Sequence, residues 1–267
     1  PTKVYICWDG REGSSKRRKT IKEYKEGRKP IRLNRNIRNL SEEQELQNKI
    51  WQQLRLAEYI NNMPMSQIMI DFTEADDVIA ALCNFQKEEN KVIVSSDKDF
   101  FQLLDDTTVL YRPVQKEVMN KNRVTDKFLI HPNNFALARA IAGDKSDNLP
   151  GIKGAGLKTI AKKFPDMCGE ETYTIKRLLK DCNKVENKLK IHNAIIENKE
   201  LIEKNYKIMQ LYTPSISTAT SAIIKEHIKN YPKQFARTNI RKMMIEDGFG
   251  EMNWSDLFSS LNKIHRG

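Results

Sequence analysis

The chain has 267 residues, of which 39% are hydrophobic and 30% charged, with a net charge of +11 and a mean hydropathy of -0.64. This composition is that of a globular protein with a sizeable core, and it excludes a disordered chain. No run approaches the roughly 20 apolar residues that a membrane span needs, and no signal peptide is recognisable. We therefore expect a cytoplasmic protein.

The excess positive charge is concentrated near the start of the chain. Between Arg11 and Arg38 twelve Lys or Arg stand against three acids, so this block carries +9 of the +11. Such a block is usually a solvated face or a flexible tail. Its position between a strand-like run and a helix favours contact with nucleic acid.

The first elements predicted in chain order are a strand and two helical segments. Residues 4–8 form an apolar run that ends at Asp9, which indicates a strand with a carboxylate at its end. The basic residues at 22, 25, 28 or 29, 32 and 35 have the spacing of one helical face, which Pro30 should break or kink. Ser41, with Gln44 three residues later, predicts the N-cap of a helix that reaches about residue 60.

The middle of the chain alternates strands and helices. We predict a strand at 67–71, a helix at 75–89, a strand at 92–96, a short helix through 104 and a strand at 109–112. From His131 the pattern changes, because Pro132 opens a helix to about residue 142 and nearly everything after it is helical. The prediction is an α/β fold with a central mixed, largely parallel sheet flanked by helices. Residues 1–130 would form the catalytic body and 131–267 a helical region.

Acidic residues recur where predicted strands end and helices begin. A single Asp at a helix start is more often an N-cap, but three acids within four residues are harder to explain by capping. We therefore select eight carboxylates as candidate metal ligands: Asp9, Glu74, Asp76, Asp77, Asp97, Asp99, Asp144 and Asp147.

Converging carboxylates need a cation, because two unit charges about 4 Å apart repel by roughly 4 kcal/mol at an effective dielectric near 20. Ligand sets made of oxygen atoms select hard ions such as Mg²⁺ or Mn²⁺. Two such ions can clamp the attacking and leaving oxygens of a phosphodiester displacement. The pattern therefore indicates phosphoryl transfer.

A glycine-rich segment follows, at residues 148–160. Its glycines allow backbone groups to face a phosphate or an ion directly, and a helix that begins near Leu157 would direct amides at a DNA phosphate. An ordinary glycine-rich turn is the simpler interpretation. The predicted DNA contacts in this segment are Gly151, Lys153, Gly154, Gly156, Lys158 and Thr159.

These segments together resemble the 5′ nuclease family, which includes flap endonucleases, phage 5′ exonucleases and the nuclease domain of bacterial DNA polymerase I. TEADDVIA resembles the central acidic motif of the family, SSDKDFFQLL the next motif, and GDKSDNLPGIKGAGLKTI its helix–three-turn–helix signature, here at about 133–165. The resemblance covers the chain to about residue 165. The helical remainder is more loosely similar to the ribonuclease H of T-even phages.

The resemblance implies a mechanism and a set of roles. Glu74, Asp76 and Asp77 would hold one Mg²⁺, with Asp9 nearby. A second Mg²⁺ would be held by Asp97, Asp99, Asp144 and Asp147. Mn²⁺ could replace Mg²⁺, and K⁺ would lie at the glycine hairpin. Lys25 and Arg28 match residues that contact the scissile phosphate, Tyr24 an aromatic that stacks on a nucleotide, and Lys22 a further DNA contact. Residues 16–62 would form an arch around a single-stranded 5′ end.

The implied activity is hydrolysis near 5′ ends or flaps of DNA or RNA–DNA hybrid during primer removal and repair, by a monomer in a host bacterial cytoplasm if the source is a phage. A single-strand-binding protein or a sliding clamp would be its protein partners. The family begins with an earlier strand that carries a metal-binding aspartate, and we expect that segment upstream of Pro1. Without it, the alternative is a catalytically impaired protein that binds DNA junctions.

Two other classes of protein are disfavoured. A membrane-surface protein would need an apolar face opposite the basic residues, and the basic block lacks one. The cysteines at 7, 83, 168 and 182 form no CxxC pair and no zinc-site spacing, which indicates neither a disulfide framework nor a structural zinc. We expect all four to be reduced and mostly buried.

Overall fold

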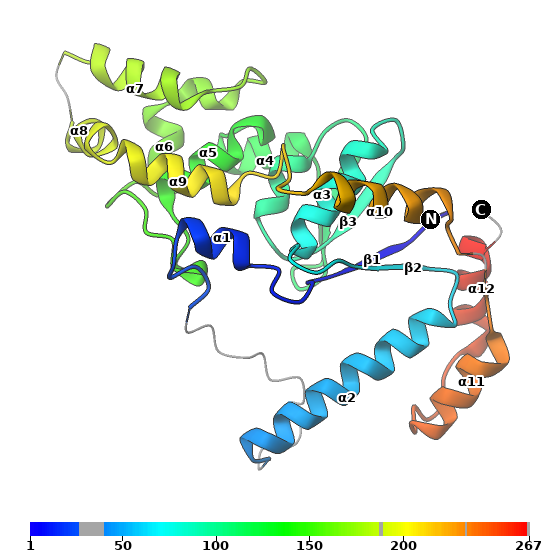
Figure 1. The fold of residues 1–267 in the computed structure, drawn as a ribbon. Coiled ribbons are helices and arrows are strands. Elements are labelled where there is room, and N and C mark those ends of the chain that lie inside the picture. The colour runs from blue at the N-terminus through cyan, green and yellow to red at the C-terminus, as the bar shows by residue number, and fades with distance from the viewer. Residues whose placement is uncertain (27–39, 187–188, 233, 266–267) are drawn as a thin grey trace. The chain divides into compact units, whose positions relative to one another are not determined.

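The computed structural model describes residues 1–26, 40–186, 189–232 and 234–265 (Figure 1). The chain divides into two compact units, each made of segments that are distant in sequence. The first unit comprises residues 1–8, 29–70 and 218–267, and the second comprises 9–28 and 71–217. The units do not follow the predicted boundary near residue 130, because the N-terminal strand and the C-terminal helices share a unit.

In its described residues, the first unit combines two parallel strands with four helices. Strand β1 (Tyr5–Trp8) pairs with β2 (Ser66–Met69), so that Tyr5 lies opposite Ser66 and Trp8 opposite Met69. The helices are α2 (Glu42–Asn61), α10 (Thr218–Lys229), α11 (Arg237–Glu246) and α12 (Trp254–His265). Their core is a cluster of buried side chains: Tyr59, Ile240, Met244, Leu261 and Ile264.

Helix α2 confirms the predicted N-cap. The Ser41 hydroxyl accepts from the Gln44 amide at 3.2 Å, and the Gln44 side chain accepts from the Ser41 amide at 3.0 Å. This reciprocal capping box satisfies two of the amides that a helix start leaves without partners. The helix therefore begins at Glu42, directly after Ser41.

The second unit contains a three-stranded mixed sheet. Strand β3 (Lys91–Val94) is parallel to β4 (Thr108–Arg112), which is antiparallel to β5 (Glu117–Met119). The predicted α/β fold with largely parallel pairing is confirmed, although the strands form two small sheets. Strand β5 and helix α4 (Lys121–Phe128) were not predicted, because residues 113–128 are mostly polar and lack a clear apolar period.

Helices make up the rest of the second unit. They are α1 (Ser15–Thr20), α3 (Ala75–Phe85), α5 (Pro132–Ala142), α6 (Leu157–Lys163), α7 (Ile175–Lys184), α8 (Lys190–Glu197) and α9 (Lys199–Met209), with 3₁₀ turns η1 (Asp99–Leu103), η2 (Lys145–Asp147) and η3 (Pro165–Cys168). Phe101 and Phe135 pack edge to face in the core at 5.3 Å between ring centroids. Helix α9 is tied to α5 by the buried Asn205, which donates to the Ala140 carbonyl at 3.0 Å.

Two sequence predictions are corrected. Residues 22–26 form turns and not the predicted helical face, while the rest of that face, at 28–35, falls outside the described residues. None of the four cysteines forms a disulfide, and only Cys182 is buried, whereas Cys7, Cys83 and Cys168 are partly exposed, so the expectation of mostly buried cysteines was wrong. In the described parts, no helix has the length and hydropathy to cross a bilayer.

Candidate metal centre

Asp9 is fixed at the start of α3. Its Oδ1 accepts from the amide of Ala75 at 2.9 Å, and the neighbouring Gly10 amide donates to the Thr73 carbonyl at 3.0 Å. A carboxylate at this helix end is stabilised by the positive end of the helix dipole. Asp9 therefore acts as a helix cap beside the acidic motif.

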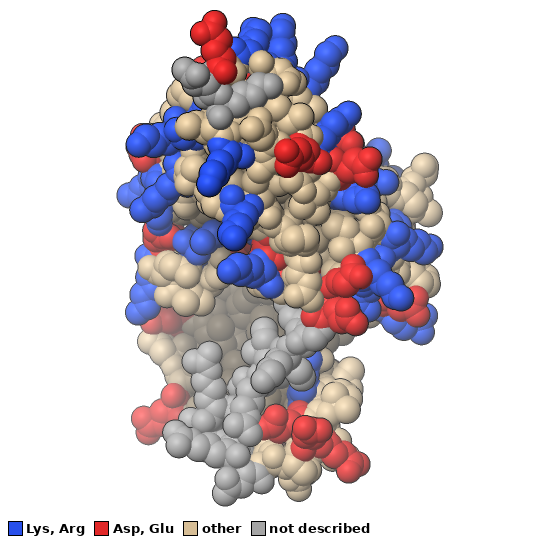
Figure 2. Space-filling view, turned by 90° about the vertical axis from the view of Figure 1, so that its left-hand side faces the viewer, with Lys and Arg blue, Asp and Glu red and all other residues tan. Residues whose placement is uncertain are grey.

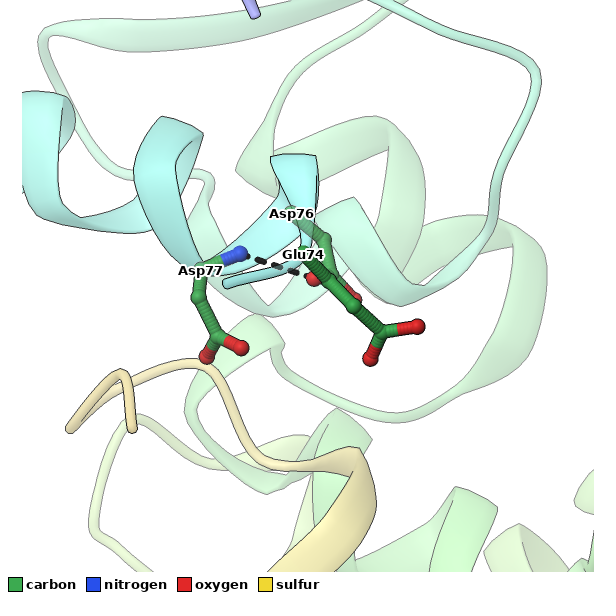
Figure 3. A group of neighbouring side chains, drawn as sticks. All are labelled: Glu74, Asp76 and Asp77. Atoms are coloured by element: carbon green, nitrogen blue, oxygen red, sulfur yellow. Dashed lines mark hydrogen bonds between the residues drawn. The ribbon is translucent and has the colours of Figure 1, made fainter. Parts of the chain in front are cut away.

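The first turn of α3 brings three carboxylates together. Oxygen atoms of Glu74, Asp76 and Asp77 all lie within 4.8 Å of one another. Figure 3 shows the three side chains leaving this turn, with the Asp77 amide donating to Asp76 Oδ1 at 2.8 Å. Asp77 also accepts from the Ser215 amide at 3.0 Å. This cluster is the core of the predicted first metal site.

An arginine from α1 pairs with all three acids of this cluster and offsets part of their charge. Arg17 Nη1 lies 3.0 Å from Asp76 Oδ2, its Nη2 lies 3.2 Å from Asp77 Oδ2, and it also forms an ion pair with Glu74. Burial by itself would lower the pKa of Arg17, but the charges of Asp76 and Asp77 raise it above its ordinary value. The guanidinium thus stays charged in a site where only 9% of its side chain is exposed.

A second arginine joins two of the later aspartates. Arg139 Nε lies 2.9 Å from Asp99 Oδ1, and the same guanidinium forms an ion pair with Asp144. Burial and the nearby Asp97 raise the pKa of Asp99 to about 6 although Arg139 opposes them. Burial would also raise the pKa of Asp144, but hydrogen bonds from Ser146 and the charge of Arg139 lower it.

The two predicted groups of carboxylates share one cavity of about 50 Å³. Since a water molecule takes about 30 Å³ in the liquid, this space accommodates a group of ionic size. Asp76 contributes from the first group, and three aspartates contribute from the second. The lining residues are Arg17, Tyr24, Lys25, Asp76, Asp97, Asp99, Asp147, Leu149, Ile208 and Met209. The structure therefore brings together acids from three separate stretches of chain.

Lys25 points into this group of carboxylates. Its ammonium lies 2.5 Å from Glu74 Oε1, and its amide donates to the Asp147 carbonyl at 3.1 Å. Its φ of 56° is uncommon for a residue with a side chain, and such strain is often found at functional sites. Tyr24 is only 3% exposed and packs in the core, so its ring is not presented for stacking. Arg28 lies outside the described residues.

The glycine hairpin presents an open backbone. Gly154 has a φ of 81°, and a Cβ there would meet no atom within 4 Å, as at Gly156. Lys153 and Lys158 are exposed, and Thr159 is partly buried. Gly151 differs, because a Cβ would come within 1.9 Å of the Ala142 carbonyl. Gly151 therefore allows two backbone segments to pack closely, and Gly154 faces open space.

The donor set fits hard divalent cations. All the candidate ligand atoms are carboxylate oxygens, the kind preferred by Mg²⁺ and Mn²⁺. Arg17 and Arg139 supply positive charge among these acids. Sequence reasoning singled out neither arginine. A lone arginine in the apolar stretch of α5 was a usable signal for Arg139, whereas the run KRRK gives no sign that Arg17 turns inward.

Arg17→Met should destabilise the protein strongly in the absence of divalent ions. Removing one partner from a buried ion-pair network typically costs about 3–5 kcal/mol, because the remaining charges lack compensation. Thermal unfolding in EDTA and in Mg²⁺ measures the effect, and Mg²⁺ should recover most of the lost stability. Arg18→Met, at an exposed neighbouring position, is the control. Equal losses with and without Mg²⁺ would contradict a cation site at this cluster.

Comparison with known proteins gives a consistent group of relatives. The family described as "5′-3′ exonuclease, N-terminal resolvase-like domain" matches residues 1–129. A 5′-3′ exonuclease of Aquifex aeolicus is 37% identical over 145 residues, which cover 52% of this chain and 46% of that protein. A flap endonuclease Xni of a Shewanella species is 30% identical over 216 residues, which cover 80% of this chain and 74% of that protein. The chain spans about half the length of the first two curated relatives it matches.

Solved structures share the fold. A T5 5′-exonuclease with bound zinc superposes with a TM-score of 0.68 at 18% identity, over 86% of this chain and 84% of that one. The T5 D15 flap endonuclease in a complex with DNA and metal ions superposes with a TM-score of 0.62 at 17% identity, over 90% of this chain and 84% of that one. At these identities the likeness establishes the fold.

Proposed function

The chain belongs to the 5′ nuclease family, and from that premise we propose that it is a structure-specific 5′ nuclease that hydrolyses phosphodiester bonds at 5′ ends and flaps of DNA. The observation that carries the proposal is the cavity in which Asp76, Asp97, Asp99 and Asp147 converge with Lys25. Acids that share a cavity with a lysine suit the binding of cations and a phosphate together.

Two Mg²⁺ ions are the proposed cofactor, with Mn²⁺ as a substitute. Glu74, Asp76 and Asp77 would hold one, and the later aspartates the other. When bound, such ions supply Lewis-acid stabilisation of the attacking and leaving oxygens. Lys25 would leave Glu74 to neutralise charge on the scissile phosphate, and Arg139 would keep Asp99 and Asp144 in position. Arg28 is proposed to assist Lys25, from the resemblance alone.

DNA would be held by backbone and lysine contacts outside the cavity. The open Gly154 and the exposed Lys153 and Lys158 support a duplex strand at the hairpin, where K⁺ bound by carbonyls is part of the same proposal. Lys and Arg side chains also gather on the side of the second unit that carries α7 and α8 (Figure 2). Such a surface suits a polyanion. The proposed enzyme also tolerates RNA in the 5′ strand. It acts as a monomer, with a single-strand-binding protein or a sliding clamp as its protein partner.

A cleavage assay tests the function. The protein with Mg²⁺ should release short products from a duplex that carries a labelled 5′ flap, and should leave the matching 3′-flap duplex nearly intact. EDTA should abolish the reaction. Tight binding of the 5′-flap duplex with no cleavage in Mg²⁺ or Mn²⁺ would favour the alternative of a junction-binding protein that lacks activity.

Gly154→Val should weaken binding to fully paired DNA by about tenfold, the value of one hydrogen bond to a charged group. The new side chain would occupy the open space in which a phosphate approaches the backbone. Gly248→Val is the matched control, because Gly248 has a similar φ of 69° and equally open surroundings. The test is the affinity of both variants and the parent for fully paired DNA, measured in Ca²⁺. If both variants bind duplex DNA like the parent, the hairpin does not hold the duplex.

A further inference from the structure

The last turn of helix α9 contacts both the glycine hairpin and the carboxylate cavity. The helix lies along α5 (Figure 1) and ends at Met209. The Asn205 side chain reaches the start of the hairpin, whereas Ile208 and Met209 line the cavity. Positions 205 and 209 lie only about 6 Å apart along a helix that rises about 1.5 Å per residue. One turn of helix therefore joins the two regions.

Asn205 holds the base of the glycine hairpin. Its Nδ2 donates to the carbonyl of Pro150 at 2.8 Å and to that of Ala140 at 3.0 Å. Pro150 directly precedes Gly151, which packs so closely on the Ala142 carbonyl that a Cβ would lie 1.9 Å from it. Because this packing leaves no room for adjustment, the hairpin follows Pro150, and Asn205 fixes Pro150 to α9.

The amide of Asn205 is unusual for a fully buried position. The side chain is 0% exposed, and its Oδ1 has no hydrogen-bond partner among the residues that the structure describes. An unpaired buried acceptor destabilises a fold, and local violations of this kind are expected at functional or strained sites. The two hydrogen bonds that Asn205 donates are the interaction that an apolar residue could not supply.

Gln102 ties the other end of this turn to the carboxylate cavity. Its Nε2 donates to the carbonyls of Asp99 at 2.8 Å and Met209 at 3.0 Å, and its Oε1 accepts from the Leu211 amide at 2.6 Å. The side chain is buried, and both Asp99 and Met209 line the cavity. Gln102 therefore fastens the end of α9 to a candidate metal ligand.

We propose that residues 205–209 of α9 act as a spacer that fixes which phosphodiester enters the carboxylate cavity, with Asn205 and Gln102 as its positioning residues. The inference rests on the proposed function, in which the hairpin holds the duplex and the cavity holds the scissile phosphate. Successive nucleotides of a duplex strand lie about 3.4 Å apart along its axis, so a fixed spacing between the two regions selects one position of the DNA. Since a misplacement of about 1 Å can slow a reaction by about 10²-fold, cleavage at the neighbouring phosphodiesters is suppressed.

The lengths of the cleavage products test the spacer. A labelled 5′-flap duplex is cleaved in Mg²⁺ under single-turnover conditions by the parent, by Asn205→Leu and by Gln102→Met. The parent should cut predominantly at one phosphodiester, whereas both variants should release a several-fold larger share of products that are one nucleotide longer or shorter. Slower cleavage with unchanged product lengths in both variants would overturn the proposal.

Asn134→Leu is the matched control. Asn134 is another fully buried asparagine that ties α5 to a second segment, since its Nδ2 donates to the carbonyls of Met167 at 3.2 Å and Gly169 at 3.0 Å. These partners lie outside the hairpin and the cavity. Asn134→Leu should therefore lower the melting temperature at least as much as Asn205→Leu and still keep the parental product lengths. Equally broadened products from Asn134→Leu would mean that any loosening of the second unit has this effect, and the spacer would be rejected.

Hydroxyl-radical footprinting of the flap duplex in Ca²⁺ reads the position of the bound DNA without cleavage. With the parent, the protected stretch should end at one nucleotide, and with Asn205→Leu and Gln102→Met this boundary should spread over neighbouring nucleotides. That difference, without cleavage by the parent in Mg²⁺, would support the spacer and reject the nuclease. Cleavage by the parent, with the same products and the same sharp boundary in both variants, would support the nuclease and reject the spacer. A parent footprint without a defined boundary would also reject the spacer.

Discussion

Asp76→Ala is expected to abolish cleavage while leaving affinity for duplex DNA within a few-fold of the parent. Asp76 is the member of the α3 cluster that lines the cavity, where it faces aspartates from two other parts of the chain. A ligand carboxylate positions the cation and repels phosphate, so its loss removes chemistry and not attraction for DNA. Single-turnover cleavage in Mg²⁺ and equilibrium binding in Ca²⁺ measure the two effects separately.

The control for Asp76→Ala is Asp71→Ala. Asp71 precedes the same helix but is exposed and pairs with Arg11 at 2.9 Å, outside the cavity. That variant should cleave DNA at nearly the parental rate. Asp144→Ala extends the test to the second group, since this acid reaches the cavity region through Arg139. Near-normal turnover by both Asp76→Ala and Asp144→Ala would overturn the two-metal assignment.

The elements predicted most closely are those whose ends are set by local chemistry. Helix α5 runs from Pro132 to Ala142 as expected, because proline suits the first turn and His131 caps it by accepting from the Asn133 amide. Gly143, with a φ of 74°, ends the helix. In α2 the capping box is equally local. Such signals act within a few residues, so a single sequence carries them in full.

The helical face predicted to begin at residue 22 was wrong over residues 22–26, because the conformation there depends on distant residues. The spacing of its lysines suits a helix, but the backbone turns there to meet the loop at 144–149. The Lys25 amide donates to Asp147, and Asn148 binds carbonyls of the same segment. Tertiary contacts of this kind override helical propensity, and no local pattern announces them.

The sequence pointed to the acids of the candidate site and, through the family resemblance, to Lys25, but not to the two arginines that pair with the acids. Asp97 and Asp99 lie between the end of β3 and the start of η1, as the sequence suggested, and both line the carboxylate cavity. The charge balance could not be predicted, because which of four adjacent basic residues turns inward depends on packing. Arg17 is buried while Lys16, Arg18 and Lys19 are exposed. The structure therefore adds the cations that keep these acids together.

Lys25→Ala is expected to depress single-turnover cleavage by about 10²–10³-fold with little loss of DNA affinity. The Lys25 ammonium already lies among the carboxylates, 2.5 Å from Glu74, where a scissile phosphate would be met. A preorganised charge in a site with little water stabilises the transition state more than the ground state. Alanine keeps the left-handed backbone strain at this position, whereas glycine would also relieve it, so alanine isolates the role of the side chain.

Lys19→Ala is the matched control, since Lys19 is an exposed residue of α1 that does not line the cavity. An ordinary phosphate contact mainly affects binding, and its loss lowers the salt slope by roughly one. Lys19→Ala should therefore lose affinity in a salt-dependent way and keep its bound-state rate, the reverse of Lys25→Ala. Both variants are measured with enzyme in excess at two salt concentrations. If Lys25→Ala then cleaves as fast as the parent, Lys25 only guides DNA towards the site, and the metal ions proposed to bind the carboxylates carry the chemistry without it.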